Sequence, residues 1–189
     1  MKTSSLLAGI LLALSVAGPV TAKSRNVTDP DAPRSLPAEG RVSVDWTDPA
    51  QFSDIRYSGN SWEAKRGNWV EQLAEYLQKS ADKRLPPGER LQVTITDIKR
   101  AGQYEPWRGP NLQNTRVVRD LYPPRISLTF KRTDAQGNVI DQGERKLIDS
   151  GFLQGSTPLG DSDPLRYEKS LLDDWLRKDL KLESGISAR

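Results

Sequence analysis

Apolar and polar residues alternate in four short segments of the chain, and this period of two predicts four β-strands. The segments cover residues 41–46, 91–95, 126–130 and 139–149. A turn-forming run at 134–138, Asp-Ala-Gln-Gly-Asn, separates the last two segments. Such a run between two strand patterns favours an antiparallel hairpin.

Two longer segments repeat their apolar residues every three to four positions, which predicts amphipathic helices. The first spans 68–84, with Asn68 as its N-cap and a Pro-Pro-Gly run beyond its end. The second starts with a capping residue and a proline at 162–164 and continues to about Leu180. The order is thus strand, helix, three strands, helix. We expect an α+β fold in which a mixed, mainly antiparallel sheet of about four strands carries both helices on one face.

Gly143 and the five tryptophans allow two further predictions, one about strand geometry and one about the core. The apolar residues before and after Gly143 do not fit one continuous alternation, so we expect a β-bulge there. Four of the five tryptophans are expected in the core: Trp46, Trp62, Trp69 and Trp175. The fifth, Trp107, lies in a loop rich in Gly and Pro and is expected to be partly exposed.

The first 22 residues have the three parts of a secretory signal peptide. Lys2 gives a positive start, residues 6–14 form an apolar run, and Val20-Thr21-Ala22 provides the small residues that precede a cleavage site. The apolar run is shorter than the roughly 20 residues that a bilayer span needs. We therefore expect cleavage after Ala22, a periplasmic location and a soluble mature chain without a membrane span.

The rest of the chain is expected to form one domain with short disordered ends. Residues 23–40 contain three prolines among polar and charged residues and show no apolar period, which predicts a disordered tail. Residues 41–182 are long enough for a single domain. Residues 183–189 are expected to be a disordered C-terminus.

The composition excludes several kinds of chemistry. The 189 residues contain no His and no Cys, which rules out a His general base, a Cys nucleophile, a disulfide and a zinc site built from these residues. A formal net charge of +3 is too small to predict a nucleic-acid-binding protein. The sequence predicts no cofactor, no metal and no catalytic residue, and it leaves the oligomeric state open.

The long irregular loop at 100–125 is the first candidate site. It lies in a cationic stretch, and loops of this length in compact domains are often functional. Arginine forks bind anions through two parallel hydrogen bonds, so the loop could hold an anionic component of the cell envelope. The candidate binding residues are Tyr104, Trp107, Arg108, Arg116, Arg119, Tyr122 and Arg125. The alternative is that these cations pair inside the fold, for example with the acidic residues at 134–179.

Asp45, Asp48 and Asp54 form a second, acidic candidate near the end of the first strand. Paired with Asp97 or Asp149, they could act as the carboxylates of a hydrolase that cleaves an envelope glycan. Turn formation and helix capping are the simpler explanation, because Asp before Pro is a common turn former.

Several short motifs resemble an uncharacterised family of proteobacterial secreted proteins, a domain of unknown function. The motifs include Val44-Asp45-Trp46, Leu85-Pro86-Pro87-Gly88, Arg116-Val117-Val118-Arg119-Asp120, Tyr122-Pro123-Pro124, Leu147-Ile148-Asp149 and Tyr167-Glu168-Lys169. They occur in order over roughly residues 41–180. The resemblance implies no activity and no catalytic residues.

We therefore expect a non-enzymatic periplasmic module that binds an anionic envelope component or a periplasmic protein through the 100–125 loop. The carboxylate hydrolase is the alternative.

Overall fold

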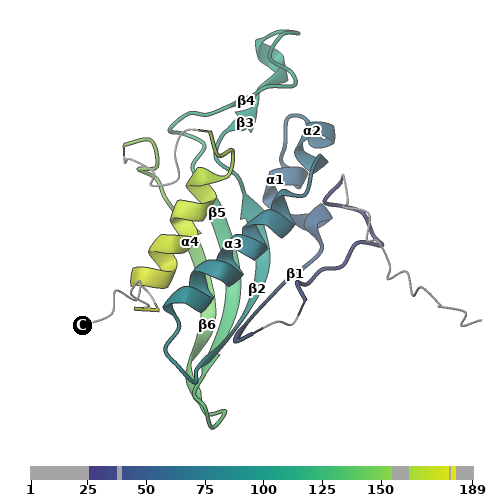
Figure 1. Cartoon of the computed structure of the whole chain (residues 1–189). Helices are drawn as coiled ribbons and strands as arrows, with labels where there is room; N and C mark the ends of the chain where they lie inside the picture. The colour runs from purple at the N-terminus through teal and green to yellow at the C-terminus, as the bar shows by residue number, and fades with distance from the viewer. Residues whose placement is uncertain (1–25, 38–39, 155–161, 179, 182–189) are drawn as a thin grey trace, which may run out of the picture.

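In the computed structural model, which describes residues 26–37, 40–154, 162–178 and 180–181, a four-stranded sheet carries two helices on one face (Figure 1). The expected signal peptide at 1–22 and the expected C-terminal tail at 183–189 lie outside the described residues. Within the described residues, no helix is long and apolar enough to cross a membrane.

The sheet is mixed and mainly antiparallel, as the sequence predicts. Its strands are β1 (Val42–Trp46), β2 (Arg90–Lys99), β5 (Arg125–Thr133) and β6 (Val139–Ile148). They lie in the order β1-β2-β5-β6. β1 and β2 are parallel because a helical crossover joins them, whereas β2, β5 and β6 are antiparallel neighbours.

The two helices are α3 (Trp69–Arg84) and α4 (Arg166–Lys178), and both lie on the same face of the sheet (Figure 1). Their apolar stripes meet the inward-facing residues of the strands and form one core. Its fully buried members include Leu73, Leu77, Ile95, Leu128, Leu172 and Leu176. Asn68 is the N-cap of α3, but its side chain donates to Glu71 Oε2 (3.1 Å) and makes no bond to the helix backbone.

Short elements fill the two longest connections. The link from β1 to α3 contains the 3-10 turn η1 (Pro49–Gln51) and the helices α1 (Ser53–Arg56) and α2 (Ser61–Lys65). The link from β2 to β5 contains β3 (Gln103–Tyr104), the 3-10 turn η2 (Pro106–Arg108) and β4 (Arg116–Val117). β3 and β4 pair as a small antiparallel hairpin that projects beyond the sheet (Figure 1). We call residues 103–117 the arm.

The expectation for Trp62 is wrong, whereas the other tryptophans lie as predicted. α2 has five residues and buries only Ala64, so Trp62 projects into solvent and is 66% exposed. Trp46, Trp69 and Trp175 are buried, and Trp107 is 67% exposed.

The bulge expected at Gly143 is also wrong. Gly143 pairs with Phe130 in an uninterrupted register, and the shift in β6 occurs at Ile140, next to the hairpin. A Cβ at Gly143 would lie 2.9 Å from Nη1 of Arg145, whose guanidinium group covers the Phe130 ring at 5.0 Å. The alternation of apolar residues is interrupted in β6 because an arginine, rather than an apolar residue, covers this part of the core.

The structure differs from the expected tail at residues 26–37, which we call the strap. The strap runs along the outer edge of β1: Leu36 N donates to Val44 O (3.0 Å), and Trp46 N donates to Arg34 O (2.9 Å). Val27 and Leu36 also pack against the core. Two apolar residues nine positions apart have no period, so the sequence pattern could not reveal this contact.

Candidate functional site

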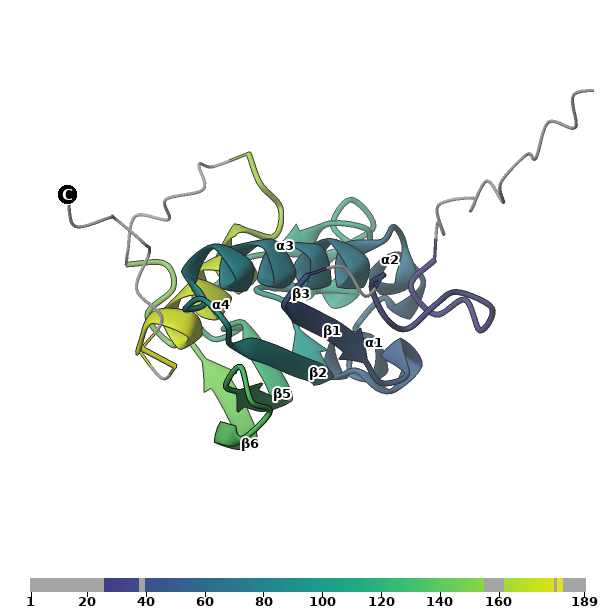
Figure 2. The same ribbon diagram turned by 60° about the horizontal axis from the view of Figure 1, so that its bottom comes forward.

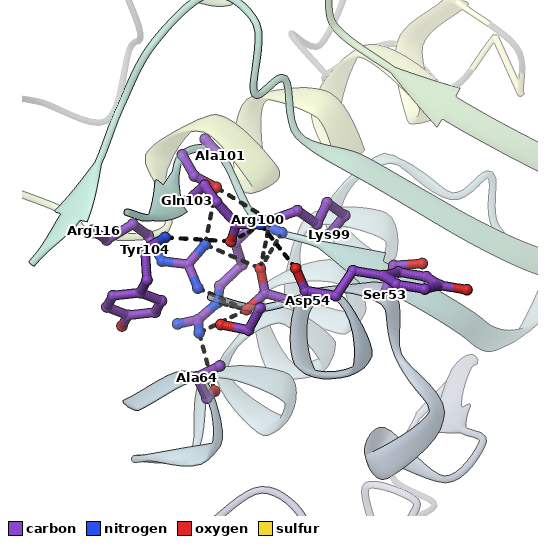
Figure 3. A network of polar contacts seen from close by, with 12 residues as sticks. Ser53, Asp54, Ala64, Lys99, Arg100, Ala101, Gln103, Tyr104 and Arg116 are labelled. Atoms are coloured by element: carbon purple, nitrogen blue, oxygen red, sulfur yellow. Dashed lines mark hydrogen bonds and ion pairs between the residues drawn. The ribbon is translucent and has the colours of Figure 1, made fainter. Parts of the chain in front are cut away.

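Asp54 anchors the arm to the rest of the domain. It lies in α1, is fully buried, and makes ion pairs with Lys99 (3.4 Å), Arg100 (2.8 Å) and Arg116 (2.8 Å), as Figure 3 shows. Arg116 binds it with both terminal nitrogens, Nη1 to Oδ1 (3.0 Å) and Nη2 to Oδ2 (2.8 Å). These four residues, the Asp54 cluster, join α1, the end of β2 and β4.

Two aromatic rings cover the arginines of the Asp54 cluster. The Arg100 guanidinium lies 4.2 Å from the centre of the Trp69 ring, and that of Arg116 lies 4.8 Å from the centre of the Tyr104 ring. Arg100 Nη2 and Trp69 Nε1 both donate to the carbonyl oxygen of Ala64, at 3.1 and 3.0 Å. Stacking and hydrogen bonding thus hold the guanidinium planes in place.

The carboxyl group of Asp54 stays ionised. Burial alone would raise its pKa, but the positive charges of Arg100, Arg116 and Lys99 outweigh burial and lower the pKa to about 2. A buried carboxylate that is saturated by cations neither donates a proton near neutral pH nor meets a substrate. Its contacts make it a structural anchor.

Glu105 forms a second anchor inside the arm. It is almost fully buried, and its Oε1 accepts hydrogen bonds from Tyr122 Oη (2.8 Å) and Arg119 Nη1 (3.3 Å). Arg108 Nε lies 3.2 Å from Oε2 as an ion pair without hydrogen-bond geometry. The two anchors place five cations around two carboxylates, so these ion pairs carry a net positive charge.

The candidate residues of the 100–125 loop therefore have different surroundings. Tyr104 is buried under Arg116, and Arg116 binds Asp54. Arg108, Arg119 and Tyr122 surround Glu105. Among the described residues, the ion-pair partners of Arg108, Arg116 and Arg119 are Asp54 and Glu105, and not the acidic residues at 134–179. Arg125 is exposed at the start of β5, and ligand binding by the loop stays a prediction.

The structure does not bring the acidic candidates together. Asp48 caps η1 by accepting from Ala50 N (3.1 Å) and pairs with Arg34 (3.3 Å), while Asp45 lies on β1 and Asp54 is enclosed by cations. In the described part of the chain, no three carboxylates are grouped as a metal site.

The carboxylates proposed as partners in a hydrolase also have local roles. Asp97 accepts from Ser53 N (2.6 Å) and Oγ (2.7 Å) at the start of α1, and Asp149 accepts from Gly151 N (2.9 Å). A cavity of about 530 Å³ lies between the strap and α3, but neither Asp97 nor Asp149 lines it. Asp45, Asp48 and Asp54 do not line it either.

Three exposed aromatic side chains lie at the end of the molecule that carries the arm. Tyr57, Trp62 and Trp107 are 65%, 66% and 67% exposed, and we call them the aromatic surface. The Arg56 guanidinium lies 5.4 Å from the centre of the Tyr57 ring, and that of Arg66 lies 5.0 Å from the centre of the Trp62 ring. The surface thus combines apolar rings with guanidinium groups.

The segment between α1 and α2 is fixed against the arm. A Cβ at Gly59 would lie only 2.2 Å from the carbonyl oxygen of Tyr104, so the two backbones are in close contact. Asn60 Nδ2 donates to Gln113 O and to Asn114 Oδ1, both at 3.0 Å. These contacts hold the segment that carries Tyr57 and Trp62 against the arm that carries Trp107.

Sequence reasoning identified Trp107 but missed Tyr57 and Trp62. One signal was available for Trp62: it follows Asn60-Ser61, a capping pair, and precedes Gly67, so its helix is too short to bury a face. Nothing in the local sequence indicates that Gly59 contacts the arm.

Family comparison adds to this description. No curated protein and no solved structure matches the chain. A family model described as "Protein of unknown function (DUF3016)" matches residues 40–178, which include the sheet, both long helices, the arm and the Asp54 cluster. The chain therefore belongs to the DUF3016 family of proteins of unknown function.

Proposed function

We propose that this domain is a non-enzymatic binding module of the cell envelope, and that the aromatic surface with its arginines recognises an anionic envelope component. The observation that carries the proposal is the exposure of Tyr57, Trp62 and Trp107, each about two-thirds open to solvent at one end of the molecule. The expected signal peptide supports the location.

Exposed tryptophan rings add little to the stability of the fold but can contribute binding energy when a ligand covers them. A large aromatic ring contributes to folding only when it leaves water, and Trp62 and Trp107 remain mostly in water. Trp, Tyr and Arg are the residues that most often dominate binding energy at protein interfaces. Rings that stay hydrated in the free protein can lose that water when a ligand covers them.

The surrounding charge favours an anionic ligand. Five cations share Asp54 and Glu105, so this set of ion pairs has a net positive charge. Arg66 pairs with Glu63 (3.0 Å) and Arg108 pairs with Glu105 (3.2 Å), but their side chains are still 61% and 49% exposed. Their remaining N–H groups can bind carboxylate or phosphate groups from solution.

The two anchors reduce the cost of binding. Asp54 and Glu105 hold the arm in place before a ligand arrives, so less conformational freedom is lost on association.

Titration of the purified chain with peptidoglycan fragments and with lipopolysaccharide tests the proposal. We expect Trp62→Ala and Trp107→Ala each to weaken binding about tenfold, because each removes a ring that the ligand would cover. The control is Gln136→Ala, in the β5–β6 hairpin turn at the opposite end of the molecule (Figure 1). Equal affinities for all four proteins, or no binding by the unaltered chain, would contradict the proposal.

A further inference from the structure

The outer edges of β1 and β6, the two outermost strands of the sheet, differ in whether another segment pairs with them. The strap pairs with the outer edge of β1, whereas no strand of the described residues pairs with the outer edge of β6. Figure 2 shows β6 as the outermost strand on its side of the sheet. An unpaired edge presents a row of N–H and C=O groups that can bind another strand.

The residues of β6 are arranged so that the strand complements itself. Its start and its end carry exposed apolar side chains, Val139, Ile140 and Ile148. Its middle carries charges of both signs: Asp141, Glu144, Arg145 and Lys146. We infer that β6 pairs antiparallel with β6 of a second copy of this chain, around a two-fold axis at Gly143.

The side-chain pattern selects this register. Facing residues in an antiparallel pair point to the same face of the sheet, so a symmetric pair is centred on one residue. With Gly143 at the centre, Asp141 faces Arg145 of the second copy, and Gln142 faces Glu144 of the second copy. Each contact occurs twice, and opposite charges at facing positions are stabilising.

Neighbouring registers lack this complementarity. A pair centred on Glu144 or on Arg145 places two like charges side by side at the axis, which is destabilising. A pair centred on Gln142 brings no opposite charges together.

The local geometry at Gly143 fits a two-fold axis. Asp141, Gly143 and Arg145 are all half-buried and alternate with exposed residues, so they lie on the helical face of the sheet. The Arg145 guanidinium extends over Gly143, because its Nη1 would lie 2.9 Å from a Cβ there. The same guanidinium lies over the Phe130 ring of β5, 5.0 Å from its centre, so it turns toward the strand edge to meet Asp141 of the second copy. The register shift at Ile140 ends the regular ladder just beyond Asp141 in each copy.

A single introduced cysteine tests the axis directly. The chain has no Cys, so Gly143→Cys provides the only thiol. Facing residues in an antiparallel pair have Cα atoms roughly 4.5–5.5 Å apart, which a disulfide can bridge. Under mild oxidation we expect this variant to form covalent dimers, while Gln136→Cys in the exposed hairpin turn stays mainly monomeric. Equal dimer yields for the two variants would overturn the inference.

Charge exchange tests the register without a cysteine. In sedimentation equilibrium of the whole chain, we expect a dimer whose dissociation constant rises about tenfold in Asp141→Arg, because two arginines then face each other twice. Adding Arg145→Asp to that variant should restore the affinity. Lys131→Glu, one strand inward, is the control and should have no effect. A monomeric unaltered chain, or a double variant no tighter than Asp141→Arg, would refute the pairing.

Discussion

At the scale of single residues, Asp54 joins the arm to α1 and to the end of β2. Taking a carboxylate out of water is costly, and its three cations with their hydrogen bonds offset that cost. Lys99, Arg100 and Arg116 are themselves mostly buried, so each of them also depends on Asp54. Loss of this one charge would leave three cations in a region of low polarity.

We expect Asp54→Asn to lower the free energy of unfolding by about 3–5 kcal/mol, because it leaves buried charges without their partner. Urea unfolding followed by circular dichroism measures this change. Asp48→Asn is the matched control: Asp48 also pairs with an arginine, but both side chains are well exposed, so the loss should stay within about 1 kcal/mol. Equal losses in the two variants would contradict the role given to Asp54.

The difference in unfolding free energy between the unaltered chain and Asp54→Asn should depend on pH. The pKa of Asp54 is lowered to about 2 in the folded protein from 3.8, so its contribution is complete above pH 4 and is lost as the pH falls towards 2. The stability difference between the unaltered chain and Asp54→Asn should therefore shrink by about 2 kcal/mol between pH 5 and pH 2. Burial, with a contribution from the charge of Asp54, raises the pKa of Glu168, so this residue has the opposite pH effect. A difference that stays constant with pH would show that Asp54 is not the titrating group.

The sequence could not predict the Asp54 cluster because its members are far apart along the chain. Asp54 is 45 positions from Lys99 and 62 from Arg116, and no local pattern joins them. The sequence offers internal pairing of the loop cations as an alternative, but it suggests the acidic residues at 134–179 as their partners. An aspartate after Phe52-Ser53 looks like a helix-start residue, and only tertiary contact shows it as an anchor.

At the scale of elements, the segments with a clear period were predictable and the short ones were not. β1, β2 and β5 place alternate residues on a buried face, β6 alternates half-buried and exposed residues, and α3 and α4 repeat every three to four residues. α1, α2, β3 and β4 are five residues or fewer, which is too short to show either period. These elements are positioned by contacts between the β1–α3 link and the β2–β5 link, rather than by burial of an apolar face.

The contact between Gly59 and the arm gives a prediction at this scale. We expect Gly59→Ala to destabilise the domain by about 1–3 kcal/mol and to speed hydrogen exchange in the arm, because its methyl group would clash with Tyr104 O. The control is Gly151→Ala, whose methyl group meets only Asp149 Oδ1 at an ordinary 3.7 Å. Unfolding in urea and amide exchange by mass spectrometry measure both effects. Similar exchange in the arm for the two variants would argue against the contact.

At the scale of the whole molecule, charge and exposed apolar surface are distributed unevenly. The arm carries more cations than its carboxylates neutralise, and the aromatic surface lies beside it. The charged residues that line the cavity under the strap are all acidic: Asp29, Asp31, Glu71 and Glu75. The near-neutral formal charge of the chain therefore hides a basic region and an acidic one, which are centred on different elements.

A chain truncated to begin at residue 40 tests the role of the strap. Without residues 26–37, the outer edge of β1 is open, and we expect particles larger than a dimer in light scattering. The double variant Val27→Ala/Leu36→Ala is the control, because it removes apolar contacts with the core but keeps the backbone pairing. Large particles in the control as well would attribute the effect to lost stability.

The strap also limits how far this fold can assemble. A sheet with two open edges can add strands without end, as fibrils do, whereas a sheet with one closed edge can accept only one neighbour. Because the strap closes the β1 edge with the chain's own backbone, any strand pairing at β6 stops at two copies. Twelve residues without a detectable secondary-structure period thus separate a finite assembly from an unlimited one.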